Sequence, residues 1–262
     1  SDVTVTHSGT IETSGLGAIG ILAQSIGGGG GFGADAGATG SVKQTTVLGG
    51  TGGTRGDGGT VTINLGNSAN ITTSGKGAVG ILAQSIGGGG GYAGTGAGNF
   101  QVAGPREWQL YIAPQPIYPY GFTPGYFLKQ EDGATGNGGS VNIRMGGARD
   151  AKFSITTTGE RAHGILAQSL GGGVGYGFKV NGDNIRQYTS TGSRSSRMSG
   201  GGSAVNINTR GDIVASGVDS YGIFIQNGLQ KADGSIDMSR SQTGINTIVH
   251  TGKIHGGSAT GA

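Results

Sequence analysis

Cysteine is absent from this sequence, and charged and aromatic residues are scarce. The lack of cysteine excludes disulfide bonds and thiolate metal sites. Charged residues make up 12% of the 262 residues, and the 17 basic and 14 acidic side chains are scattered along the chain. Scattered charge gives no strong footprint for nucleic acid or for a membrane surface, and so little charge does not suit a charge-driven disordered tail.

Long apolar segments are also missing. No stretch approaches the length of a membrane span, so we expect any export signal or membrane anchor to be encoded outside this sequence. No run of ten or more residues shows the 3.6-residue apolar period of an amphipathic helix. The 62 glycines would destabilise helices further, by up to ~1 kcal/mol per residue relative to alanine. We expect an all-β fold, because the apolar residues form short runs between glycine, serine, threonine and asparagine.

The dominant feature that is present is an internal repeat. GILAQSIGGGGG occurs at 20–31 and again at 80–91, GILAQSLGGG occurs at 164–173, and a drifted copy, GIFIQN, occurs at 222–227. An isoleucine precedes the first glycine of each copy by nine residues. These marker isoleucines are Ile11, Ile71, Ile155 and Ile213, and Ile254 marks a fifth, incomplete copy. The whole chain is therefore predicted to be one repeat array, a fragment of a longer one.

The copies are unequally spaced. They lie near 3–60, 61–140, 141–204, 205–246 and 247–262, and their marker isoleucines are 60, 84, 58 and 41 residues apart. A β-rich run precedes each marker, as VTVTHSGTI does in the first copy. The pattern predicts a β-solenoid with coils of roughly 20 residues, so that a spacing of 41 covers about two coils and one of 60 covers two or three.

Alternation along each strand predicts which residues form the core. Ile19, Ile21 and Ala23 would share one face of a strand, with Leu22 and Gln24 on the other. The isoleucine that recurs in every copy is expected to stack in the interior. These core positions are Ile21, Ile81, Ile165 and Ile223.

A glutamine recurs three residues after each core isoleucine. The four are Gln24, Gln84, Gln168 and Gln226. If the copies stack, the side-chain amides can hydrogen-bond in a ladder, as Asn and Gln do in cross-β assemblies. The alternative is a solvent-facing residue that was duplicated with the repeat.

Runs of glycine follow the first three copies. Ordering five glycines costs conformational entropy and buries little apolar surface. Two structures are reasonable: a mobile loop that extends from the solenoid, or a strand without side chains that lets backbones approach closely. Because the runs recur next to the same strand, we predict a loop that contains some ordered, closely packed glycine.

One segment departs from the repeat. Residues 100–127 contain all five prolines and eight of the sixteen aromatic residues, including the only tryptophan. Aromatic rings supply contact area at low entropic cost and proline orders a loop in advance, so this insertion is a candidate binding surface. The candidate ligand-binding residues are Trp108, Tyr111, Tyr118, Tyr120, Phe122 and Tyr126. Alternatively, the rings pack on one another as a small core that caps the solenoid edge.

Catalytic and metal-binding constellations cannot be assembled from these residues. AQSIG is similar to a nucleophile elbow, but it recurs around Ser25, Ser85 and Ser169, whereas an enzyme needs one activated serine. The four histidines lack the spacing of metal ligands, and the fourteen carboxylates do not cluster as a glycosidase or lyase requires. We predict no catalytic activity, no metal and no cofactor.

Two RGD tripeptides also occur, at 55–57 and 210–212. Such tripeptides could bind integrins if they were exposed in turns. The abundance of glycine raises their chance frequency, and they occupy non-equivalent positions of the repeat, so coincidence is favoured.

The pattern SG-x-x-A-x-GILAQSIGGGGG at 14–31 and 74–91 resembles repeats in the passenger regions of large autotransporter adhesins of Gram-negative bacteria. The resemblance covers most of the chain through the third copy and weakens after residue 200. It implies a right-handed parallel β-helix, secretion to the cell surface, and a C-terminal membrane barrel outside this sequence. It also fits the absence of cysteine, because such passengers cross the envelope largely unfolded. It assigns no catalytic or ligand-binding residue.

Together, the residues and this resemblance predict a non-enzymatic extracellular segment with a structural or adhesive role, a stiff stalk that presents loops. In one alternative, the aromatic insertion binds a glycan or a host-surface protein. In another, copies of the chain associate into an extracellular fibre. Nucleic acid is not expected as a partner, and membrane contact is expected only through the barrel.

Overall fold

The structure of the protein is a computed structural model, and its description covers ten ranges of the chain. These are 1–33, 45–48, 55–93, 99–102, 135–145, 153–172, 174–181, 184–188, 200–229 and 244–257. Within them the protein is all-β, with β-strands and no helix, as the composition predicts. Accordingly, these ranges contain no helix that is long and apolar enough to cross a membrane.

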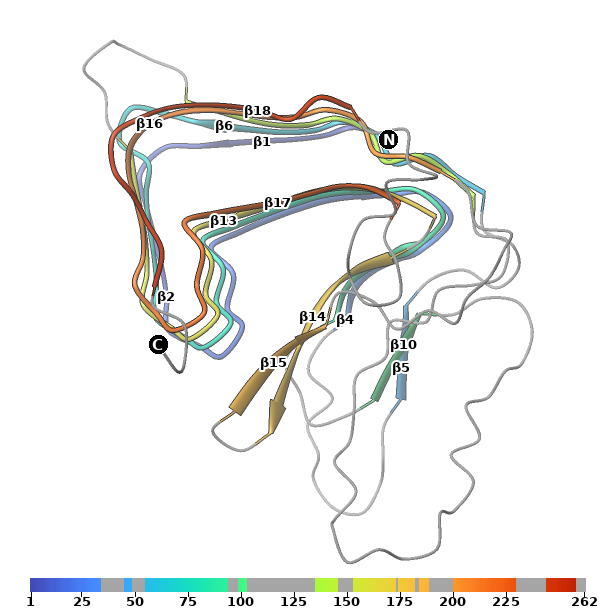
Figure 1. Cartoon of the computed structure of the whole chain (residues 1–262), viewed down its shortest axis with the longest axis horizontal. Helices are drawn as coiled ribbons and strands as arrows, with labels where there is room; N and C mark the ends of the chain where they lie inside the picture. The colour runs from blue at the N-terminus through green and yellow to red at the C-terminus, as the bar shows by residue number, and fades with distance from the viewer. Residues whose placement is uncertain are drawn as a thin grey trace, which may run out of the picture.

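Corresponding strands of successive repeats lie side by side in parallel, curled sheets (Figure 1). The first sheet contains β1 (Val3–His7), β6 (Val61–Leu65), β11 (Val141–Met145), β16 (Val205–Ala215) and β18 (Thr247–Thr251). The second contains β2 (Thr10–Thr13), β7 (Asn70–Thr73), β12 (Phe153–Thr157), β16 again and β19 (Ile254–His255). Because β16 runs through both, the two form one continuous sheet.

Each complete repeat then turns back to form further strands. The third sheet contains β3 (Ile21–Ile26), β8 (Ile81–Ile86), β13 (Ile165–Gly171) and β17 (Ile223–Leu229). A fourth contains β4 (Gly30–Gly33), β9 (Gly90–Ala93), β14 (Val174–Asn181) and β15 (Asn184–Tyr188), and β15 pairs with β14 antiparallel. β5 (Thr45–Leu48) and β10 (Asn99–Val102) form a separate parallel pair.

Strand register follows the sequence repeat residue by residue. Ile21 of β3 lies opposite Ile81 of β8, which in turn lies opposite Ile165 of β13. The marker isoleucines of the second sheet are aligned in the same way, from Ile11 in the first copy to Ile254 in the fifth. Each copy therefore forms one layer, and we number the layers 1 to 5 in chain order.

This register shows that the expected coil of roughly 20 residues was wrong. Paired glutamines in the third sheet are 60, 84 and 58 residues apart in sequence, so each repeat makes one layer and not two or three. The physical reason is that a parallel strand meets its neighbour only after the chain has completed its circuit. Here the circuit includes three core strands and, in layers 1 to 3, a further strand in the fourth sheet.

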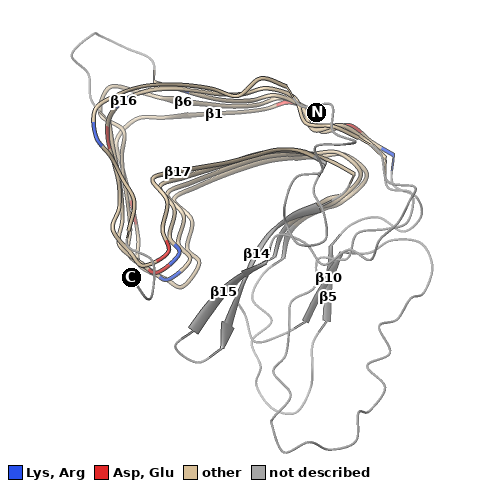
Figure 2. Cartoon of the chain, viewed as in Figure 1, with Lys and Arg blue, Asp and Glu red and all other residues tan. Residues whose placement is uncertain are grey.

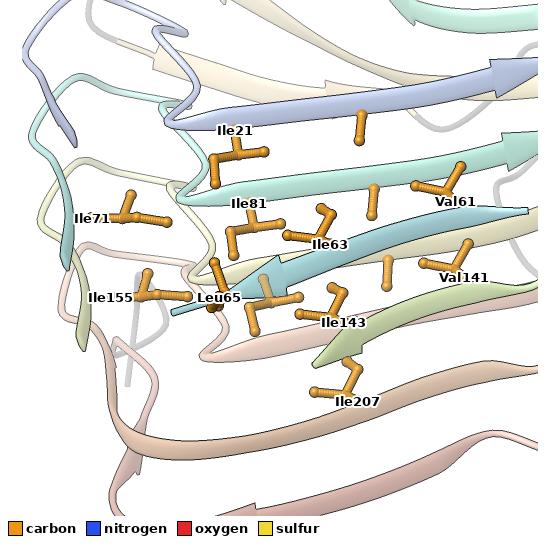
Figure 3. Close-up of a cluster of buried hydrophobic side chains, with 14 of the residues drawn as sticks. Ile21, Val61, Ile63, Leu65, Ile71, Ile81, Val141, Ile143, Ile155 and Ile207 are labelled. Carbon is orange, nitrogen blue, oxygen red and sulfur yellow. The ribbon is translucent and has the colours of Figure 1, made fainter. Parts of the chain in front are cut away.

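The first three sheets enclose a hydrophobic core (Figure 3). Val61 and Ile63 of β6 point inward together with Ile71 of β7 and Ile81 of β8, and all four are 0% exposed. The predicted core isoleucines lie in this one cluster: Ile21, Ile81 and Ile165 are buried in it, and Ile223 packs against it. Full burial of each such side chain contributes about 1.5–3 kcal/mol.

The third sheet is buried on both faces in its two middle strands, β8 and β13. One face points to the core, and the other carries aliphatic clusters around Leu82 and Ile86. Ile19 packs in the cluster with Leu22, so the expected grouping of Ile19 with Ile21 was wrong. The alternation does not extend that far because β3 begins only at Ile21, after a bend.

The glycine runs are short bends that lead into strands. Gly28 and Gly29 have φ values of 85° and 99°, a region that favours glycine, and Gly30 then begins β4. A Cβ atom on Gly30 would lie 1.9 Å from the carbonyl oxygen of Gly90 in the next layer. The predicted close packing is therefore present, but the predicted loop is reduced to the bend.

Candidate functional site

The aromatic candidates fall in the range 103–134, which lies outside the described residues. They are Trp108, Tyr111, Tyr118, Tyr120, Phe122 and Tyr126. The described polar chemistry is concentrated elsewhere, in side chains that occupy the same position in successive layers and contact one another along the stack.

A continuous glutamine ladder runs through the third sheet. Gln24 Nε2 donates to Gln84 Oε1 at 2.6 Å, and Gln84 Nε2 donates to Gln168 Oε1 at 2.5 Å. Gln168 Nε2 donates to Gln226 Oε1 at 2.5 Å in the same direction. Gln84 and Gln168 are 0% exposed, so the structure has the ladder and not the solvent-facing alternative. Such amides must be paired, because an unpaired buried amide costs about 1–3 kcal/mol.

The repeated serines connect the third sheet to the start of the first. Ser85 Oγ donates to Gly59 O at 2.7 Å and accepts a hydrogen bond from Gly139 N of the next layer, also at 2.7 Å. Ser25 and Ser169 make the same two bonds with the equivalent residues of their layers. Each hydroxyl proton is thus given to a backbone carbonyl, an arrangement that holds layers together and does not activate a nucleophile.

A third polar stack lies in the turn between the second and third sheets, residues 14–20 in layer 1. Thr13 Oγ1 donates to Ala18 O at 2.6 Å, and Thr73 and Thr157 make the same bond in layers 2 and 3. The left-handed position of the turn is a glycine in layers 1 and 2, as at Gly17 with φ 62°. The SG-x-x-A motif, which reads TG-x-x-A in layer 3, is therefore a hydrogen-bonded turn that repeats in layers 1 to 3.

Opposite charges meet across the layers at this turn, and Figure 2 shows them gathered at the corner near the C-terminus. Lys76 Nζ lies 3.7 Å from Glu160 Oε2, between layers 2 and 3. Arg161 donates to Asp219 Oδ2 at 2.8 Å, between layers 3 and 4. These pairs were not predicted from the sequence. Aligning the turns SGKGA, TGERA and SGVDS would have revealed them, because the charges fall at equivalent positions of neighbouring copies.

His163 is part of a ring stack on the outer face of the third sheet. It is 0% exposed, and its Nδ1 accepts a hydrogen bond from Tyr221 N at 3.0 Å. Its ring centroid lies 5.2 Å from that of Tyr221 and 5.6 Å from that of Phe224. In the described ranges, His, Asp and Glu side chains nowhere form a group of three or more that could hold a metal ion.

Both RGD tripeptides use their aspartates within the stack. Asp57 Oδ1 accepts a hydrogen bond from Asn137 N at 2.7 Å, and Asp212 Oδ1 accepts one from Lys253 N at 3.1 Å. Gly211 has φ 124° in the interior of β16, where its absent side chain allows Phe153 O of the preceding layer to approach. These contacts favour a structural role for both tripeptides.

Two shallow grooves follow the corners of the stack. One, of about 550 Å³, runs past Asp57 and Asn137 and is otherwise lined mostly by glycine. The other, of about 400 Å³, runs between Asn70 and Asp212. Several polar side chains of each groove already hydrogen-bond to an adjacent layer: Asp57 and Asn137 in the first groove, and Asn70, Ser154 and Asp212 in the second. Comparison of the chain with known protein families, with curated proteins and with solved structures finds no match.

Proposed function

We propose that this chain is a segment of a β-solenoid, a right-handed parallel β-helix, that serves as a non-enzymatic structural or adhesive part of a bacterial cell-surface protein. The observation that carries the proposal is the in-register stacking of the repeats. The resemblance of GILAQSIGGGGG to autotransporter passenger repeats supports the export route and the cell-surface location.

The polar residues of the repeat support a scaffold role. Gln84 and Ser85 use their side-chain hydrogen bonds on neighbouring strands and layers, and so do the residues equivalent to them. A catalytic site needs side chains that are held in place yet directed at a substrate. In this protein the repeated hydroxyls and amides are directed at other groups of their own layer or of the adjacent layer.

The mechanism would be mechanical. Parallel layers lie about 4.8 Å apart, and their backbone hydrogen bonds run along the stacking axis. The glutamine bonds, the bonds that the serine hydroxyls accept from the next layer, and the Arg161–Asp219 pair run between layers in the same general direction. Because all of these bonds connect one layer to the next, bending or extending the stack would strain many of them together.

The location can be tested with an antibody raised against the purified chain. We expect the antibody to label intact, unpermeabilised cells that make the protein, and we expect external protease to remove that label. Labelling that appears only after permeabilisation would contradict the proposal. An antibody against a cytoplasmic protein serves as the control for cell integrity.

A second candidate, recognition of a glycan or host protein, is favoured by the concentration of aromatic residues and proline at 100–127. Its test is adhesion of cells that display the chain. The double variant Trp108→Ala/Tyr111→Ala should abolish adhesion while the β-sheet circular dichroism is retained. Leu16→Ala, an exposed apolar residue of the turn, is the matched control. Unchanged adhesion in the double variant would eliminate this candidate and leave the structural role.

A further inference from the structure

His163 lies at the joint between layers 3 and 4, at a position that holds an aliphatic residue in layers 1 and 2. The strand register places it in one row with Ile19 and Val79. It is 0% exposed, and its ring packs against the phenol ring of Tyr221 and the ring of Phe224, both in layer 4. A titratable side chain thus replaces an aliphatic one at this joint.

One hydrogen bond fixes the protonation state of this ring. The backbone N–H of Tyr221 donates to Nδ1 of His163 at 3.0 Å. Because a backbone amide can only donate, Nδ1 carries a lone pair and the imidazole is neutral. In layer 2 the equivalent amide, that of Val79, donates instead to Gly77 O of its own turn at 3.1 Å. The turn of layer 4 therefore depends on a neutral His163 in layer 3 for this bond.

The ring lies next to an apolar part of the structure. Phe224, whose ring it contacts, also packs against the aliphatic cluster of Val79, Leu82 and Leu166. All three aliphatic side chains are 0% exposed. A positive charge in such surroundings is strongly unfavourable unless an opposite charge compensates it.

The charged groups of the adjoining turns are already paired with one another. Arg161, two residues before His163, donates to Asp219 at 2.8 Å, and Lys76 of layer 2 lies 3.7 Å from Glu160. The strands that follow these turns, β8, β13 and β17, contain no Asp, Glu, Lys or Arg. In the described part of these turns and strands, an imidazolium would therefore have to share a carboxylate with an existing cation.

We propose that His163 makes the joint between layers 3 and 4 sensitive to acid. Protonation of Nδ1 removes the acceptor of the Tyr221 N–H and sets two N–H groups against each other. The turn at 216–222 in layer 4 then moves away from layer 3, so that water reaches the charged ring. The joint between layers 1 and 2, which has Ile19 and Val79 in this row, contains no such group and stays closed.

The direction of the pH effect follows from the neutral ring. Above the ordinary histidine pKa of about 6.5, the imidazole is neutral in the closed and the open joint alike, and the joint has its full stability. Well below that value, the open joint binds a proton that the closed joint excludes, so opening becomes about tenfold more favourable for each further pH unit. From about pH 7.5 to about pH 5.5, the opening constant should therefore increase about tenfold.

Hydrogen exchange of the full chain at these two pH values, corrected for the intrinsic exchange rates, measures the opening of each joint. In the wild type, peptides from β17 and from 216–222 should lose about tenfold in protection at the lower pH, whereas β8 in layer 2 should change little. The inference rests on the stacked layers and not on a cell-surface role, so either can fail without the other.

Two variants and one control complete the test. His163→Asn keeps an acceptor for the Tyr221 N–H but does not titrate in this range, so it should abolish the pH response of β17. If its β-sheet circular dichroism is lowered, His163→Val, which copies Val79 of layer 2, replaces it with the same expectation. His250→Gln removes the histidine that contacts Thr209 between layers 4 and 5, and it should respond like the wild type.

Three results would overturn the proposal. The first is equal protection of β17 at both pH values in the wild type. The second is an unchanged pH response in the His163 variant, and the third is loss of the response in His250→Gln.

Discussion

At the scale of single residues, the glycine that opens each GILAQS motif explains the nine-residue spacing from the marker isoleucine. A Cβ atom on Gly80 would lie 2.6 Å from the carbonyl oxygen of Gly164 and 2.6 Å from Cγ2 of Ile155, both in the next layer. Gly20 and Gly164 meet the same two groups one layer further along. The glycine and the isoleucine of neighbouring copies thus fit against each other, so neither can vary alone.

Gly80→Ala should lower the free energy of unfolding by about 1–3 kcal/mol, because neither the backbone carbonyl nor the branched side chain can move away freely. Denaturant titration followed by circular dichroism measures the change. Gly15→Ala is the matched control, since the same methyl group would make only an ordinary contact there, 3.4 Å from the Cβ of Ala18, and should change stability by less than about 0.5 kcal/mol. Equal losses of unfolding free energy in the two variants would show that the change from glycine to alanine itself, and not the contact with the next layer, determines the result.

The glutamine ladder leads to a second prediction for single residues. Gln84→Leu removes both of its hydrogen bonds and leaves the buried Oε1 of Gln168 and the partly buried Nε2 of Gln24 without these partners, at a cost of about 2–4 kcal/mol in total. Gln24→Leu, at the end of the ladder and only partly buried, should cost about half as much. Urea denaturation of both variants gives the ranking. A ladder that contributes nothing to stability would give equal, small effects.

At the scale of one structural element, the turn between the second and third sheets favours a particular order of the layers. Arg161 and Asp219 occupy its left-handed position with φ of 53° and 54°, where layers 1 and 2 have glycine. Their side chains are 23% and 27% exposed and lie 2.8 Å apart. This pair favours layer 3 next to layer 4, whereas the hydrophobic core, which is nearly identical in each layer, favours no order.

Charge reversal tests this role of the turn. Arg161→Glu and Asp219→Arg should each lower the free energy of unfolding by about 0.5–1 kcal/mol, and the double variant should recover at least half of the summed loss. Lys76→Glu is the comparison: its partner Glu160 lies 3.7 Å away and Lys76 is 43% exposed, so the effect should be smaller. Added salt should reduce all these differences. Strict additivity in the double variant would show that the ion pair stabilises nothing.

At the scale of the whole molecule, each layer depends mainly on the layers directly above and below it. β8 and β13 in layers 2 and 3 are completely buried, whereas β18 and β19 in layer 5 are largely exposed. Stability in such arrays is approximately a sum over neighbouring units, so the ends open first.

The height of the stack increases slowly with the number of repeats: five layers at about 4.8 Å give a stack only about 20 Å high. A stalk of useful length would need many more repeats.

Hydrogen exchange should reveal this gradient. We expect the amides of β8 and β13 to exchange more slowly than those of β1 and β19 by about two orders of magnitude or more. Mass spectrometry of peptides from each layer measures the rates at a concentration where the chain is monomeric. Uniform exchange across all layers would mean that the stack opens as one cooperative unit.

The sequence by itself determined the all-β class, the five copies and the core isoleucines, because a strand alternates its side chains and a stacked repeat must keep the same apolar residue at the same place. Ile21, Ile81 and Ile165 could be identified from recurrence alone. The glutamine ladder could be suggested but not decided, since the pattern of Gln24 and Gln84 is the same whether their side chains face solvent or another sheet.

Only the tertiary structure decided how much chain makes one layer, what the glycine runs do, and which charges meet. These features depend on distances between residues about 60 or more apart in sequence, and on backbone contacts that leave no periodic trace. Gly30 looks the same in the sequence whether it lies in a loop or against Gly90. The contact of its backbone with the next layer is what makes it part of a strand.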